Sequence, residues 1–224
     1  MTDDQVTELI VHGIVVGIFQ ENCWVIGNRR TGEAVCIDPG DEPDRILDMA
    51  KDMGVKIKAI ANSHAHVDHI LGVREIQRQT GAKFYLHAGE APIAAMAVDT
   101  ALRYTGQVTE PPPDPDFNPL DGDIIEVEGL QLTVIHTPGH TPGSLSYYTN
   151  GVLFSGDTLF QSSIGRTDLP GGDYDQEMAS IVDKLLALPD ETIVLPGHMA
   201  ETRIGVEREM NPYIRQELMR RRAV

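Results

Sequence analysis

The segment Asn62-Ser63-His64-Ala65-His66-Val67-Asp68-His69 decides the fold and the chemistry of this chain. It follows a short β-branched stretch and precedes an amphipathic one, so it is predicted to link a strand to a helix. On an extended backbone, side chains two residues apart point to the same side, so His64 and His66 can converge. Asp68 and His69 fall in the first helical turn, where backbone N–H groups favour a carboxylate. The segment therefore predicts a metal site, with one ion close to His64 and His66 and a second close to Asp68 and His69.

Three further polar residues directly follow predicted strands. His140 lies in a Thr-Pro-Gly-His turn, Asp157 in a Ser-Gly-Asp turn, and His198 in a Pro-Gly-His turn. The glycine before each of them allows a close approach of the backbone. Together with the first segment, these residues complete a set of seven candidate ligands for two metals.

Composition limits the class of protein. At 224 residues, with 41% hydrophobic and 23% charged residues, the chain is typical of a globular protein and fits one domain over residues 1–224. The formal net charge of −16 argues against nucleic acids and membrane surfaces as partners, because both carry negative charge. Met1–Gln5 lacks the features of a signal peptide, and no apolar run approaches membrane-spanning length, so a cytoplasmic location is expected. Cys23 and Cys36 lie in apolar stretches and are expected to be buried free thiols.

The rest of the pattern arranges strands and helices in two blocks. Strands are predicted at 9–19, 23–26, 34–37, 56–61 and 83–86, and again at 123–127, 130–136, 144–149, 152–155 and 192–195. Helices are predicted at 43–53, through the histidine segment to 79, at 174–188, and twice near the C-terminus, the last one capped by Asn211-Pro212. Residues 88–122 are interpreted as an irregular surface excursion in which 91–104 could be helical. Two blocks of strands followed by helices favour a mixed α/β (α+β) fold, a sheet sandwich flanked by helices.

The order His-x-His-x-Asp-His at 64–69, then Gly-His, Gly-Asp and Gly-His, resembles the pattern of the metallo-β-lactamase superfamily. The resemblance implies a four-layer αββα sandwich with the metals at one edge of the two sheets. It assigns His64, His66 and His140 to a first metal, Asp68, His69 and His198 to a second metal, and Asp157 to both. It also implies that Asp38 supports the metal loop from behind the ligands. A plain Asp-Pro-Gly turn is the alternative role for Asp38.

Within the superfamily, the stretches 156–160, 164–170 and 207–213 resemble compact glyoxalase II-like hydrolases. That resemblance implies hydrolysis of a small-molecule thioester, S-(2-hydroxyacyl)glutathione or a related compound, by a hydroxide shared between two Zn²⁺ ions. Iron or manganese would also suit the nitrogen and oxygen ligands. Asp68 would orient the hydroxide, and Arg166 falls where those enzymes place a basic residue for the glutathione carboxylate. Asp157 argues against a true β-lactamase, because those branches typically have Cys or Ser at that position.

Other activities of the same fold stay open. A mononuclear iron persulfide dioxygenase shares the Gly-Arg-Thr-Asp stretch of 165–168 and would use His64, His140 and Asp157. A lactonase is a further alternative, and the oligomeric state is open.

The substrate contact is open as well. Asp168 and Ala200 stand where glyoxalase II enzymes usually have tyrosines that contact the tripeptide, so the thiol carrier is not fixed by the sequence. Arg166 could form an internal salt bridge to Asp168 or Asp173 in place of a bond to a substrate carboxylate.

Overall fold

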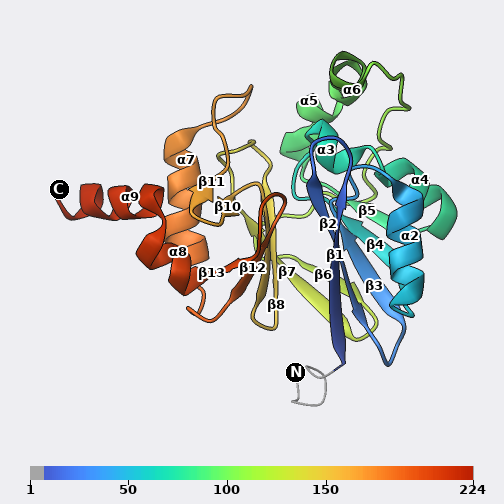
Figure 1. Cartoon of the computed structure of the whole chain (residues 1–224), viewed down its shortest axis with the longest axis horizontal. Coiled ribbons are helices and arrows are strands. Elements are labelled where there is room, and N and C mark those ends of the chain that lie inside the picture. Colours follow the sequence, from blue (N-terminus) through green and yellow to red (C-terminus); the bar gives the residue numbers. More distant parts are fainter. Residues whose placement is uncertain (1–7, 224) are drawn as a thin grey trace. The chain divides into compact units, whose positions relative to one another are not determined.

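The computed structural model describes residues 8–223, and the chain divides into two compact units (Figure 1). The first unit runs to Pro119 and also contains Ile124–Leu132, and the second contains Leu120–Asp123 and the chain from Thr133 onward. Both units combine strands with helices, so the expected mixed α/β class is confirmed. Met1–Gln5, on which the expectation of no signal peptide rests, lies outside the described residues.

The first unit is built on a five-stranded sheet with the order β1-β2-β3-β4-β5. β1, β2 and β3 pair antiparallel, whereas β3, β4 and β5 pair parallel. The strands of this sheet are β1 (Leu9–Val16), β2 (Glu21–Asn28), β3 (Glu33–Ile37), β4 (Lys56–Ala61) and β5 (Lys83–Tyr85). The first unit also contains β6 (Ile124–Val127), which is not part of this sheet. Its helices are α2 (Pro43–Asp52), α3 (Val67–Ile70), α4 (Val73–Thr80), η1 (Ala88–Glu90), α5 (Ala91–Ala94) and α6 (Ala97–Thr105).

The core of the first unit is formed by its sheet and by the helices α2 and α4, which lie side by side in Figure 1. Exposed Lys56 and Lys58 alternate with buried Ile57 and Ala59 in β4, as expected for a strand with one face covered. The apolar faces of the two helices complete the core with Ile46, Ala50, Val73 and Ile76.

Cys23 and Cys36 belong to this core. Both are buried and free, with their sulfur atoms 3.6 Å apart, so the expectation of buried thiols is confirmed. Burial raises the pKa of the Cys23 thiol, and its hydrogen bond with Cys36 raises it further. The thiol of Cys23 therefore stays protonated and unreactive near neutral pH.

The second unit contains strands with the neighbour order β13-β12-β9-β8-β7, of which only β9 and β12 pair parallel. Asn150 and Gly151 both have left-handed φ angles, +45° and +78°, and form the hairpin turn between β8 and β9. The strands are β7 (Leu130–His136), which starts in the first unit, β8 (Leu145–Thr149), β9 (Val152–Gly156), β10 (Leu159–Phe160), β11 (Ser163–Ile164), β12 (Ile193–Pro196) and β13 (Thr202–Arg203). The helices are α7 (Tyr174–Ala179), the π-helical η2 (Ser180–Lys184), η3 (Leu185–Ala187), α8 (Ile204–Met210) and α9 (Pro212–Arg222).

The prediction of one continuous helix from the histidine segment to residue 79 is wrong. α3 ends at Ile70 and α4 begins at Val73. In the break, Gly72 donates its N–H to the carbonyl of Pro39 at 2.9 Å, and a Cβ on Gly72 would lie 2.7 Å from that oxygen. The close approach of the turn after β3 therefore interrupts the helix.

Other differences concern short elements. The predicted helix at 174–188 is present, but it passes from α7 into η2 and η3. The predicted excursion at 88–122 contains the short helices η1, α5 and α6 before its proline-rich part. The two-residue strands β10, β11 and β13 were not predicted, because a strand of two residues has no periodic pattern. Among residues 8–223, no helix is long and apolar enough to cross a membrane.

Gly40 should tolerate no side chain. A Cβ on Gly40 would lie 1.6 Å from the carbonyl oxygen of Asp68, so Gly40→Ala must displace the turn after β3 from α3. Gly81 ends α4 at φ +70° with open space around it, so Gly81→Ala should cost only the left-handed strain of about 1–2 kcal/mol. Denaturant unfolding should therefore show a larger loss of free energy for Gly40→Ala, and equal losses would contradict this packing.

Candidate metal centre

The structure brings the four candidate ligands of the first unit together. His64 and His66 lie on the extended segment after β4, and Asp68 and His69 lie in α3. The ring of His64 is 4.8 Å from that of His66 and 4.1 Å from that of His69, measured between centroids. Nε2 of His69 lies 3.8 Å from Oδ2 of Asp68. His64 and His69 are buried, whereas His66 and Asp68 are partly open to solvent.

Asp38 lies beside this loop because β3 and β4 are parallel and end at the same edge of the sheet. Its Oδ1 accepts the N–H of Ser63 and its Oδ2 accepts the hydroxyl of Ser63, both at 2.6 Å. Oδ2 also lies 3.2 Å from Nδ1 of His69. Asp38 has φ +50°, a left-handed conformation that aspartate adopts more readily than most residues. Asp38 thus contacts both the loop backbone and a candidate ligand, which a plain turn residue would not do.

The contacts at Nδ1 determine which nitrogen of each buried histidine carries a lone pair. The hydroxyl of Ser63 donates its single proton to Asp38, so it accepts the Nδ1–H of His64 at 2.9 Å. Nδ1 of His69 faces the carboxylate of Asp38, which only accepts hydrogen bonds. In the neutral form, both rings therefore have the proton on Nδ1 and the lone pair on Nε2, which is the form that binds a metal.

In the second unit, Asp157 lies between His140 and His198. The parallel pairing of β9 with β12 brings the residues that follow both strands to one edge. Nε2 of His140 and Nε2 of His198 each lie 3.7 Å from the same oxygen, Oδ2 of Asp157. Nδ1–H of His140 donates to the carbonyl of Arg166 at 2.7 Å, so the neutral form of this ring too has its lone pair on Nε2.

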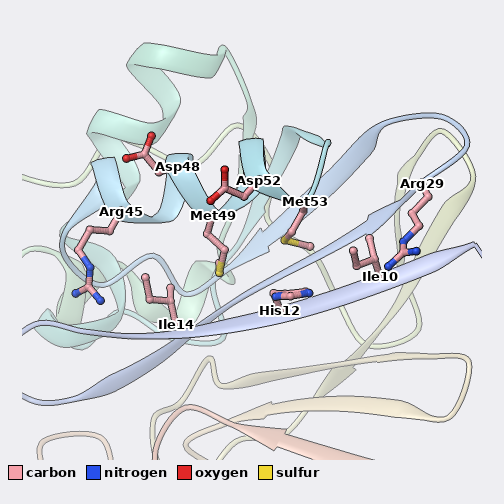
Figure 2. Close-up of a pocket in the computed structure, with 9 residues that line it drawn as sticks. All are labelled: Ile10, His12, Ile14, Arg29, Arg45, Asp48, Met49, Asp52 and Met53. Atoms are coloured by element: carbon pink, nitrogen blue, oxygen red, sulfur yellow. The ribbon is translucent and has the colours of Figure 1, made fainter.

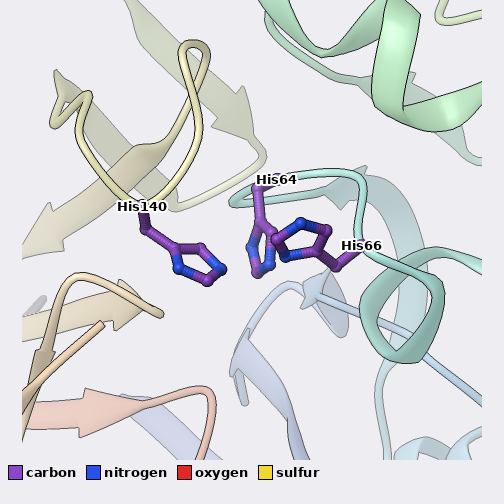
Figure 3. Close-up of side chains that lie close together, drawn as sticks. All are labelled: His64, His66 and His140. Carbon is purple, nitrogen blue, oxygen red and sulfur yellow. The ribbon is translucent and has the colours of Figure 1, made fainter. Parts of the chain in front are cut away.

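This donor set fits divalent metal ions. Figure 3 shows three of the imidazoles, those of His64 and His66 from the loop after β4 and that of His140 from the loop after β7. Two ligand atoms about 2.0–2.1 Å from one tetrahedral ion lie about 3.4 Å apart. Within each unit, histidine Nε2 atoms and carboxylate oxygens are separated by a similar 3.7–3.8 Å. Imidazole and carboxylate ligands suit zinc, and they suit iron and manganese as well.

Two buried glutamates that sequence reasoning missed hold the backbone of the ligand loops. Oε2 of Glu90 accepts the N–H of Ala65, and Oε2 of Glu177 accepts the N–H of His140, each at 2.8 Å. Both glutamates have an exposed fraction of 0%. The available sequence signal for Glu177 is its place one helical turn before the apolar Ile181 in the predicted helix at 174–188.

The surroundings of Glu177 are unfavourable for a negative charge. Burial raises the pKa of its carboxyl well above the usual value. The N–H of His140 opposes this rise, and the negative charge of Asp157 adds to it.

The side chain of Arg166 forms the internal ion pair that was the alternative to a substrate contact. Its Nε and Nη2 donate to the two carboxylate oxygens of Asp168, each at 2.8 Å, and both side chains are exposed. The hydrogen bonds from Arg166 lower the pKa of Asp168 to about 2, so the pair is ionised at neutral pH. Asp173, the other possible partner, caps α7 and accepts the N–H of Gln176 at 2.9 Å.

A pocket of about 870 Å³ lies between β1 and α2 in the first unit (Figure 2). Ile10, Ile14 and Met49 contribute apolar surface to it, and Arg45 and Asp48 contribute charge. None of the seven candidate ligands is among the residues that line it. The pocket is therefore separate from the candidate metal centre.

Residues 16–198 match the family described as the metallo-beta-lactamase superfamily. The match spans most of the chain, so the chain belongs to this superfamily of generally hydrolytic metalloenzymes, and its fold implies a site for divalent metal ions. The resemblance inferred from the ligand motif is thereby confirmed.

Relatives match over nearly their whole length. An uncharacterized protein of Aquifex aeolicus is 38% identical over 212 residues, 92% of this chain and 97% of that protein. Hydroxyacylglutathione hydrolase GloC of Haemophilus influenzae is 33% identical over 205 residues, 90% of this chain and 96% of that protein.

Solved structures show the same fold. BLEG-1, described as a B3 metallo-beta-lactamase, has a TM-score of 0.85 and 38% identity, over 92% of this chain and 99% of that chain. TTHA1623, solved in a di-iron-bound form, has a TM-score of 0.80 and 36% identity, over 90% of this chain and 99% of that chain. The expected metallo-β-lactamase fold is therefore confirmed.

Asp38→Asn should weaken metal binding. The two carboxylate oxygens of Asp38 accept the N–H and the hydroxyl of Ser63, and one of them also faces Nδ1 of His69. An amide has a single acceptor oxygen and cannot make all three contacts. Loss of such an outer partner of a ligand typically costs about 10–100-fold in metal affinity, which competition between the protein and a chromogenic chelator for zinc would measure. Asp41→Asn is the matched control, since the exposed Asp41 accepts the N–H of its neighbour Glu42 in the same turn. Equal zinc affinities of the two variants would contradict this role of Asp38.

Proposed function

We propose that this chain is a dinuclear-metal hydrolase, a thioesterase of glyoxalase II type that acts on S-(2-hydroxyacyl)glutathione or a related small-molecule thioester. The observation that carries the proposal is the place of Asp157, whose Oδ2 lies 3.7 Å from Nε2 of both His140 and His198. These two histidines are proposed as ligands of different metals, so Asp157 has the position that a bridging carboxylate needs. The name and the 33% identity of GloC support the substrate class.

In this proposal both units contribute ligands. The first metal is held by His64, His66 and His140, the second by Asp68, His69 and His198, and Asp157 contacts both. The family match over residues 16–198 covers parts of both units, which supports the shared site and the expectation of one domain over residues 1–224.

Bound metals would supply an activated water and would polarise the carbonyl of the substrate. The chain itself would position the reactants. Asp68, whose side chain is 18% exposed, stands in the first turn of α3, where its carboxylate can orient the attacking water. A thiolate leaves with little help from a proton donor, so no protein nucleophile is required. Cys23 and Cys36 are buried and could not serve as one.

Zinc is the proposed metal, with two ions per chain. The nitrogen and oxygen donors suit it, and they also suit iron and manganese. The di-iron form of the 36% identical TTHA1623 supports two metals and makes iron the main competitor. A cytoplasmic location belongs to the same proposal, and the free thiols of Cys23 and Cys36 agree with it.

One observation favours a second candidate, hydrolysis of a β-lactam. BLEG-1 is described as a metallo-beta-lactamase and is 38% identical to this chain. Because this relative is so similar, the residue type of Asp157 alone does not decide against that activity. An activated water that attacks a thioester carbonyl could also attack the carbonyl of a lactam ring.

Metal analysis combined with a panel of substrates tests the proposal. The purified protein should contain two zinc ions per chain and should hydrolyse lactoylglutathione faster than a cephalosporin or a lactone. One iron per chain, with oxygen uptake on glutathione persulfide, would identify a persulfide dioxygenase in place of the hydrolase. A clear preference for the cephalosporin or the lactone would replace the thioester as the substrate.

Asp157→Ala should lower the metal content and abolish hydrolysis together, because both proposed metals lose a ligand. Metal content per chain and turnover would be measured on the same preparation. Asp175→Ala removes an exposed carboxylate at the start of α7 and serves as the control with unchanged metal content. Two metals and normal turnover in the Asp157 variant would exclude the bridging role.

Arg166→Ala should raise KM for a thioester that bears a carboxylate and leave kcat nearly unchanged, if Arg166 binds that carboxylate. The expected loss is about 1.5–3 kcal/mol, the range for a charge-assisted hydrogen bond, or roughly ten- to hundredfold in KM. Asp168→Ala removes the partner of Arg166 and should not raise KM. A similar loss on uncharged thioesters, or a parallel rise of KM in the Asp168 variant, would leave only the internal ion pair as the role of Arg166.

A further inference from the structure

One side of the segment formed by α7 and η2 carries polar side chains. Glu177, Ser180 and Lys184 are spaced by three and four residues, so they lie on the same side of this helical segment. We name these three residues the α7 stripe. Glu177 and Ser180 are buried, with exposed fractions of 0% and 4%.

The first two residues of the α7 stripe bind the turn that carries His140. Glu177 accepts the N–H of His140 through Oε2 at 2.8 Å. The hydroxyl of Ser180 donates to the carbonyl of Pro138 at 2.7 Å. Glu177 thus offers an acceptor to a backbone N–H, and Ser180 offers a donor to a backbone carbonyl.

The third residue holds the start of the same turn. Nζ of Lys184 donates to the carbonyl of His136 at 2.7 Å and to the carboxylate of Asp121 at 3.1 Å. Asp121 in turn accepts the N–H of His136 at 2.7 Å. Both backbone groups of His136, which ends β7, are therefore fixed.

The turn also packs directly on the backbone of α7. Gly139 has φ +146°, and a Cβ there would lie 2.2 Å from Cα of Glu177. The carbonyl of Gly139 accepts the N–H of Asp173, the residue that caps α7, at 2.7 Å. The chain that leads into His140 therefore follows the surface of the helix.

We propose that the α7 stripe positions His140 as a metal ligand, with Glu177 as its principal residue. Glu177 fixes the backbone of His140, and the carbonyl of Arg166 then fixes Nδ1 of the ring. The position of Nε2 follows from these two bonds. This inference rests on the proposed function, because it takes His140 to be a ligand. Glu177 contacts no reacting atom and is a positioning residue.

Zinc affinity of the folded protein is the first measurement, by competition with a chromogenic chelator. Glu177→Ala should bind zinc about 10–100-fold more weakly, the range for loss of an outer partner of a ligand. Glu177→Gln should recover most of this loss, because its amide oxygen can still accept the N–H of His140. Ser180→Ala should have a smaller effect, since it acts two residues away from His140.

Met178→Ala is the matched control for a general loss of stability. Met178 neighbours Glu177 and is just as buried, but it packs in the apolar core of the second unit. Its variant should lose unfolding free energy in denaturant and keep the zinc affinity of the wild type. Equal zinc affinities of Met178→Ala and Glu177→Ala would overturn the proposal, and so would equal losses in the Gln and Ala variants of Glu177.

A second readout needs no metal. In the metal-free protein, ¹⁵N spectra of the histidine rings should show His140 with its proton on Nδ1, and Glu177→Ala should produce a mixture of both neutral forms. An unchanged ring signal in that variant would overturn the positioning role. Failure of the proposed function looks different: either the wild type binds no zinc, or His140→Ala binds zinc as tightly as the wild type. In both cases the ring spectra still decide whether Glu177 positions His140.

Discussion

The proposed chemistry depends on the contacts at Nδ1 of the buried histidines. His64 donates to Ser63, His69 faces Asp38, and His140 donates to the carbonyl of Arg166. A histidine in water divides between two neutral forms and a charged form near neutral pH. Of the two neutral forms, acceptors at Nδ1 select the one with its lone pair on Nε2, which is the form that a divalent metal binds. The same acceptors restrict rotation of each ring, so they set both the neutral tautomer and the direction of the ligand.

The turns that carry these histidines are held by carboxyl groups inside the protein, and burying such groups is unfavourable unless they are hydrogen-bonded. Asp38, Glu90 and Glu177 are all buried, and each accepts a backbone N–H of the turn next to it. The interior around the candidate ligands therefore concentrates carboxyl groups in a chain whose formal net charge is −16. Cations bound among the ligands would favour the ionised form of these carboxyl groups, so metal binding should also favour the folded state. The acidic interior and the metal chemistry thus have one physical basis.

The sequence predicted what depends on local spacing and missed what depends on distant contacts. His64 and His66 could be placed because two residues on one extended segment share a side, and the turns at His140, Asp157 and His198 could be placed because each follows a strand. Glu90 and Glu177 stand 25 and 37 residues from the N–H groups they accept, so only the tertiary fold reveals these contacts. The break between α3 and α4 was missed for the same reason, since its cause is the distant carbonyl of Pro39. For Arg166, the sequence offered a substrate contact or an ion pair, and the structure shows the ion pair with Asp168.

The backbone and the side chain of Arg166 make different contacts. Its carbonyl accepts the Nδ1–H of His140, and this contact is independent of the residue type at position 166. Its guanidinium is 61% exposed and pairs with the equally accessible Asp168, so it can exchange this partner for a carboxylate in solution at little cost. Substrate contacts on this loop can therefore vary through the side chain while the backbone keeps the histidine in place. With this division, the residue type at position 166 can change without loss of the carbonyl that holds Nδ1 of His140.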